Sequence, residues 1–267
     1  MLSISQFHLC LACLIHLCLS APLSTGDQLL VRLNPSQDQL TTIYIFLGMT
    51  VAVCILWNVP YLKELLFPFK LITVALHEFG HASVGLCTGA KIVSIEVNPN
   101  QGGATVMKGG NQYFTLPAGY LGSAFWGSLM IFAGFNILAS KIVAGIIGGA
   151  MLLTLFWAKN WLTRFITVAF IGVIAFLWWF QNSIGLRYFV LFIGTMSALY
   201  SLWDIIEDLV LRKVNESDAT KFSKLCCGSD KFAKLWGAIW LFISFVFVGI
   251  GILSALIAFK DSSATSL

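Results

Sequence analysis

The chain contains one group of residues suited to metal chemistry, His77-Glu78-Phe79-Gly80-His81, which forms an H-E-x-x-H pattern. If the surrounding stretch is helical, His77 and His81 lie one turn apart on the same side. Two imidazoles at this spacing can bind one Zn²⁺, and Glu78 beside them can take a proton from a water at the metal. The alternative is that these side chains satisfy one another inside a helix bundle. Ionisable groups in an apolar segment are costly and by default indicate function, which favours the metal site.

A catalytic zinc of this kind needs a third protein ligand and a position open to water. The remaining histidines, His8 and His16, lie near the N-terminus, which leaves a carboxylate. Asp204 follows the uncharged run 188–203, and we expect it to be the third ligand. Asp208 is the alternative ligand, or a residue that orients a histidine. The remaining interpretation is that both acids are solvated at the membrane surface.

The composition indicates the kind of structure that must position these residues. Of the 267 residues, 58% are hydrophobic and 10% are charged, whereas soluble domains contain about 25% charged residues. We therefore expect an α-helical polytopic membrane protein with six to seven transmembrane helices, in an endomembrane or the plasma membrane. The sequence contains no basic run interleaved with aromatic residues, so it does not indicate a nucleic-acid partner. The apolar, helix-length runs are 39–62, 71–90, 116 onward, 142–158, 165–186, 188–203 and 235–259.

The chain divides into a membrane-embedded part and flanking segments. Residues 1–21 read as a signal peptide or an N-terminal hydrophobic segment, and residues 22–41 are polar. The membrane-embedded domain is expected at 42–259, with a basic loop at 212–234, and a short tail at 260–267 follows.

Two further features lie next to the H-E-x-x-H stretch. Lys91 to Gly110 contains two runs of β-forming residues around the turn signal 98–103, which predicts a small β-hairpin after the motif helix. In the following helix, Gly119, Ser123 and Gly127 recur every four residues, so this helix can pack closely against a neighbour, for which the motif helix is a natural partner.

Together these motifs resemble those of a known family. They are His-Glu-Phe-Gly-His-Ala at 77–82, Thr-Gly-Ala-Lys at 88–91, Gly102-Gly103-x-Thr105, Gly109-Gly110, and Leu-Pro-Ala-Gly-Tyr-Leu-Gly-Ser at 116–123. In this combination the chain resembles the site-2-protease class of intramembrane zinc metallopeptidases, and most closely its small peptidase-like branch. The resemblance covers roughly Leu71 to Asp218. Better-known members carry the distal aspartate in an Asn-Pro-containing D-G motif, whereas here Trp203-Asp204-Ile205-Ile206-Glu207-Asp208 would supply it.

The resemblance implies zinc on His77, His81 and a distal aspartate, with Glu78 activating water. It also implies cleavage of the transmembrane segment of a protein substrate within the lipid bilayer. The hairpin would pair with the unwound substrate by β-augmentation, with Ile95 and Val97 as substrate-binding positions. Asn136 would bind the substrate backbone, or simply end a helix.

Two other functions fit the same residues. One is a catalytically inactive relative that binds or scaffolds membrane proteins, to which the atypical distal segment points. The other is a metal transporter that uses His77 and His81, although transport requires polar sites along the whole path and no other histidine lies in a membrane segment.

Overall fold

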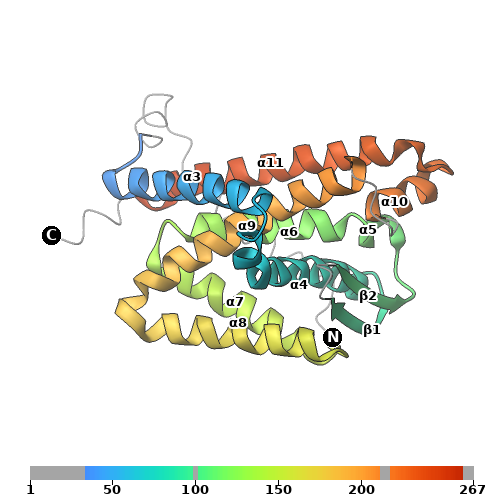
Figure 1. Cartoon of the computed structure of the whole chain (residues 1–267), viewed down its shortest axis with the longest axis horizontal. Coiled ribbons are helices and arrows are strands. Elements are labelled where there is room, and N and C mark those ends of the chain that lie inside the picture. Colours follow the sequence, from blue (N-terminus) through green and yellow to red (C-terminus); the bar gives the residue numbers. More distant parts are fainter. Residues whose placement is uncertain (1–33, 99–101, 211–216, 261–267) are drawn as a thin grey trace.

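Helices form most of the part of the chain that the computed structural model describes, namely residues 34–98, 102–210 and 217–260. For residues 204–210 this description covers the helical backbone and not the side chains. The elements in chain order are α3 (Gln37–Asn58), α4 (Lys63–Cys87), β1 (Lys91–Val97), β2 (Gly103–Lys108), α5 (Gln112–Thr115), α6 (Ala118–Ala133), α7 (Ile137–Thr154), α8 (Trp161–Trp179), η1 (Phe180–Ser183), α9 (Ile184–Val210), α10 (Asp218–Cys227), η2 (Asp230–Phe232) and α11 (Ala233–Ala258) (Figure 1).

The helical architecture expected from the apolar runs is confirmed, but the number of six to seven membrane spans is not. Among the described residues, four helical segments are long and apolar enough to cross a membrane. They are Gln37–Asn58, Ile137–Thr154, Trp161–Trp203 and Asp230–Ala258, of which the third includes α8, η1 and most of α9. The helix α6 is apolar but shorter, and α4 carries the H-E-x-x-H residues in its second half. These findings indicate a multi-pass integral membrane protein.

Three of the long helices, α3, α7 and α8, begin at polar residues whose side chains satisfy free backbone amides. The Ser36 side chain accepts a hydrogen bond from the Gln39 amide at the start of α3, and the Gln39 side-chain oxygen accepts one from the Ser36 amide, which completes a capping box. Asn136 and Asn160 are the N-caps of α7 and α8, and the side chain of each accepts one backbone hydrogen bond. These caps explain why each helix begins a few residues before the apolar run that the sequence displays.

The helix α6 lies at the centre and packs against α4, α9 and α11. Glycines make these close approaches possible: a side chain at Gly80 of α4 would collide with the Ala118 carbonyl of α6, and one at Gly127 would collide with the α9 backbone. The predicted small-residue stripe therefore faces α9 as well as α4. The buried hydroxyl of Ser197 donates to the Ser123 carbonyl and strengthens the contact of α6 with α9.

The predicted hairpin is confirmed. The strands β1 and β2 pair antiparallel, with an irregularity between Ile92 and Ser94. The outer edge of β1 is occupied, because the Ile95 amide donates to the Trp157 carbonyl and the Val97 amide donates to Thr163. Among the described residues, β2 pairs with no strand but β1, and its side chains are mostly exposed. Within the part of the chain that the structure describes, the hairpin therefore presents one free edge, that of β2.

Several predicted segments lie outside the described residues: the segment 1–21, most of 22–41 and most of the tail 260–267. The predicted basic loop at 212–234 is described from residue 217 on. There it is not a simple loop, because it contains the ten-residue helix α10, η2 and the start of α11.

Candidate metal centre

Both histidines of the H-E-x-x-H pattern project from α4 to one buried point. Their Nε2 atoms lie 3.1 Å apart, and both side chains are buried together with Glu78. The His77 ring is also enclosed by tyrosines, since its centroid lies 5.0 Å from that of Tyr120 and 6.0 Å from that of Tyr200. The predicted placement of two imidazoles on one helix face is therefore realised in a water-poor environment.

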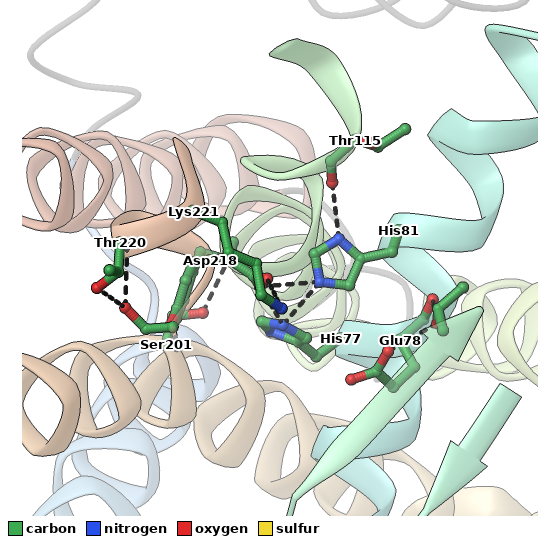
Figure 2. Close-up of polar contacts among 11 residues, drawn as sticks. His77, Glu78, His81, Thr115, Ser201, Asp218, Thr220 and Lys221 are labelled. Atoms are coloured by element: carbon green, nitrogen blue, oxygen red, sulfur yellow. Dashed lines mark hydrogen bonds and ion pairs between the residues drawn. The ribbon is translucent and has the colours of Figure 1, made fainter. Parts of the chain in front are cut away.

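A carboxylate from a distant part of the chain meets these imidazoles. The Oδ2 atom of Asp218 lies 3.2 Å from Nε2 of His77 and 2.9 Å from Nε2 of His81 (Figure 2). Asp218 is the first residue of α10, immediately after the N-cap Ser217, whose side chain accepts from the Thr220 amide. The start of α10 thus holds the carboxylate over the two rings.

An aromatic cluster docks α10 in this position. The buried Phe222 packs edge-on against Trp236 and Trp240 of α11, with ring centroids 4.7 and 5.5 Å apart. Tyr113 of α5 contacts Phe222 from another side at 6.3 Å. Because Phe222 lies one helical turn after Asp218, its burial fixes the side of α10 that carries the carboxylate.

The second nitrogen of His81 sets the protonation of the ring. Nδ1 of His81 lies 2.7 Å from the backbone oxygen of Thr115. A carbonyl oxygen only accepts hydrogen bonds, so Nδ1 carries a proton whether the ring is charged beside Asp218 or neutral, and in the neutral ring Nε2 presents its lone pair. This is the tautomer that a metal bound at Nε2 requires, and such a carbonyl partner is typical of histidines that bind metals.

Glu78 points away from the histidine pair and toward β2. The Thr105 hydroxyl lies 2.6 Å from Oε2 of Glu78 and 3.0 Å from the Glu78 carbonyl oxygen, so this strand residue holds the carboxylate. A side chain at Gly103 would collide with the other oxygen, Oε1. One ligand atom each from His77, Glu78 and His81 nevertheless lie within 4.8 Å of one another, a spacing that one bridging water can span.

The three convergent atoms of His77, His81 and Asp218 fit a tetrahedral zinc. Ligand atoms about 2.1 Å from such an ion lie about 3.4 Å from one another. The three observed separations of 3.1, 3.2 and 2.9 Å need only small outward movements to reach this geometry. A Cβ at Gly119 of α6 would collide with Nε2 of both rings, so the missing side chain leaves the required space.

The electrostatics of the cluster favour an ionised aspartate. Burial raises the pKa of Asp218, but the charge of His81 and hydrogen bonds from both imidazoles outweigh it and lower the pKa well below its usual range. The carboxylate is therefore charged at neutral pH, which metal binding requires. Lys221, one turn later and half exposed, has its Nζ atom 3.9 Å from Oδ1.

The expected third ligands, Asp204 and Asp208, lie on the last turns of α9, where side chains are outside the described residues. Their roles stay predictions. Sequence reasoning missed Asp218 because it treated 212–234 as a basic loop. Two signals could have found it: the pair Ser217-Asp218, typical of a helix start, and the spacing of the buried residues Ala219, Phe222 and Ser223, typical of an amphipathic helix.

The residues expected to bind the substrate do not lie on the free edge of β2. Ile95 and Val97 are fully buried on β1, and their amides are bonded within the protein. Asn136 caps α7 through Ala139, at the opposite end of α6 from Gly119. Sixteen residues of α6 span roughly 24 Å, so Asn136 is remote from the histidines. The alternative interpretation, that Asn136 ends the preceding helix, is wrong in detail: α6 ends at Ala133 with Gly134 as its C-cap, and Asn136 begins α7.

A family model described as Peptidase M50B-like matches residues 46–251, which is more than half of the chain and includes α4, the hairpin, α6, α9 and α10. The match confirms the resemblance to site-2-protease-like peptidases that the motifs indicate. No curated protein and no solved structure is significantly similar to the chain.

Proposed function

The chain belongs to the Peptidase M50B-like family, and from this premise we propose that it is an intramembrane zinc metallopeptidase. Its reaction is hydrolysis of a peptide bond in or near a transmembrane segment of a protein substrate. The observation that carries this proposal is the convergence of His77, His81 and Asp218 at one buried point, with Glu78 on the side of the free strand β2.

We assign the zinc ligands as Nε2 of His77, Nε2 of His81 and Oδ2 of Asp218. Three protein ligands leave one position open in a tetrahedral site, as catalytic zinc requires. In this proposal Asp218 supplies the third ligand that the sequence led us to expect from Asp204; its carboxylate lies close to both imidazoles. The tautomer of His81 and the space at Gly119 support this ligand set.

When bound, zinc supplies Lewis-acid chemistry: it acidifies a water and polarises the scissile carbonyl. Glu78 is the general base that accepts the proton of the attacking water and then donates it to the leaving amine. The Thr105 hydroxyl fixes Oε2, which leaves Oε1, in the space beside Gly103, to carry the proton. The buried rings of Tyr120 and Tyr200 keep bulk water away from His77.

The substrate strand would bind along β2. A peptide bond within a transmembrane helix is protected by its own hydrogen bonds, so the substrate must unwind locally and then find new backbone partners. The strand β2 offers such partners at its free edge, and its residues Gly103 and Thr105 adjoin the Glu78 carboxylate. Pairing by β-augmentation would therefore bring the scissile bond next to the base. We propose β2, rather than the covered positions Ile95 and Val97, as the substrate-binding strand.

The test of this function compares wild type with Glu78→Gln in proteoliposomes that contain a library of single-span transmembrane reporters. We expect wild type to cleave a subset of reporters, whereas Glu78→Gln retains zinc and loses cleavage by about 10²–10⁴-fold. Cleavage at wild-type rates by this variant would overturn the role of Glu78. A wild-type protein that binds zinc but cleaves no reporter would favour the inactive, partner-binding relative.

A further inference from the structure

The end of the bundle remote from the histidines contains a cavity that the peptidase chemistry does not use. It has a volume of about 450 Å³ and lies between the first residues of α3, α7 and α9 and the last residue after α11. In Figure 1 the start of α3 and the end of α11 lie together, away from the hairpin and α10. All four of these helices belong to segments able to span a membrane, so the cavity opens where the spans end.

Two cations line this cavity, and the residues that the structure describes around it do not balance their charge. Lys141 and Arg187 face it together with one acid, Asp38, which leaves one net positive charge. Among the described residues, none of the three takes part in an ion pair. Unbalanced positive charge at the end of a membrane span favours an anionic ligand.

Two hydrogen bonds hold the guanidinium of Arg187 in place. Its Nε atom donates to the Gly134 carbonyl at 2.8 Å, and Nη2 donates to the Thr42 hydroxyl at 2.6 Å. Only these two of the five N–H groups of the guanidinium are used within the described residues. A guanidinium fixed in this way binds a phosphate through two parallel hydrogen bonds at little cost in side-chain entropy.

The rest of the lining is apolar and suits an amphiphile. Phe135, Ile137, Leu138 and Phe259 border the cavity, and Leu138 is 66% exposed. We propose that this cavity binds a phosphate group, with Arg187 and Lys141 as its ligands, and that the apolar residues receive the glycerol and acyl part of an anionic phospholipid. This site is independent of the proposed peptidase activity.

The experiment measures the unfolding temperature of the purified full-length protein in neutral detergent during titration with phosphatidylglycerol, phosphatidylcholine or inorganic phosphate. We expect a saturable rise with phosphatidylglycerol and none with phosphatidylcholine. Lys141→Gln should weaken the phosphatidylglycerol affinity about fivefold, the effect of one positive charge near a membrane surface. The matched control Lys159→Gln removes an exposed charge that does not line the cavity, and should leave the affinity unchanged. Asp38→Asn should strengthen binding.

The outcomes distinguish a lipid phosphate from free inorganic phosphate. They also show whether the proposal holds or fails. An equal rise with inorganic phosphate would support a site for free phosphate rather than a lipid site. Equal responses to phosphatidylglycerol and phosphatidylcholine would overturn the proposal, and so would equal losses in Lys141→Gln and Lys159→Gln. An unchanged unfolding temperature without ligand establishes that each variant is folded.

Discussion

The Nε2 atom of His77 lies 3.2 Å from Oδ2 of Asp218, although 141 positions separate the two residues in the chain. His77 comes from the apolar helix α4 and Asp218 from the amphipathic helix α10, which lies outside the candidate membrane spans. The proposed metal centre would therefore be assembled by docking α10 on the membrane bundle. Mutations that loosen this docking should therefore weaken metal binding even though they change none of the metal ligands.

Phe222→Ala tests this coupling. The phenyl ring anchors α10 among Trp236 and Trp240, and its removal should cost about 3 kcal/mol of docking free energy. Because only docked α10 presents Asp218, the apparent zinc affinity falls in proportion to the docked fraction. Competition with a fluorescent chelator measures this affinity. Phe232→Ala, which removes a half-exposed ring on η2, is the control and should bind zinc as wild type does. Equal affinities in both variants would argue against docking control.

Gly119→Ala should weaken zinc binding by about tenfold or more, the scale seen when groups that support metal ligands are disturbed. The added methyl group would collide with Nε2 of both His77 and His81, so the rings must turn away from the shared point. Zinc titration of the metal-free protein measures the loss. Gly149→Ala adds the same methyl group on α7, where nothing lies within 4 Å, and should have no effect. Zinc affinity in Gly119→Ala equal to that in Gly149→Ala would contradict the geometry.

Thr105→Val removes the hydroxyl that holds Oε2 of Glu78 while it preserves the shape of the side chain. A hydrogen bond to a charged group contributes about 1.5–3 kcal/mol, so cleavage should fall about tenfold or more with zinc content unchanged. Thr105→Ser keeps the hydroxyl and should retain most of the activity. Reporter cleavage and zinc content, measured on the same preparations, test both statements. Equal cleavage by the valine and serine variants would show that the hydroxyl has no role in positioning Glu78.

Local features could be predicted from the sequence, whereas contacts between segments distant in the chain could not. His77, Glu78 and His81 are predictable because their roles follow from helical spacing within five residues, and the hairpin follows from β-forming runs around a turn. Asp218 was missed because no local pattern states which acidic residue folds back onto α4. The uncharged run that precedes Asp204 favoured that residue. Asp218 is instead positioned by the tertiary packing of Phe222. The expected substrate-binding residues Ile95 and Val97 lie on β1, where both side chains are buried in the protein and not available to a substrate.

The measurement that tests this account most directly is the zinc content of the detergent-purified protein in wild type, Asp218→Ala and Asp204→Ala. Asp230→Ala, on η2 near α10, controls for the loss of a nearby acid. We predict about one zinc per chain in wild type, in Asp204→Ala and in Asp230→Ala, and almost none in Asp218→Ala. Full zinc in Asp218→Ala together with loss in Asp204→Ala would contradict the assignment and return the third ligand to α9.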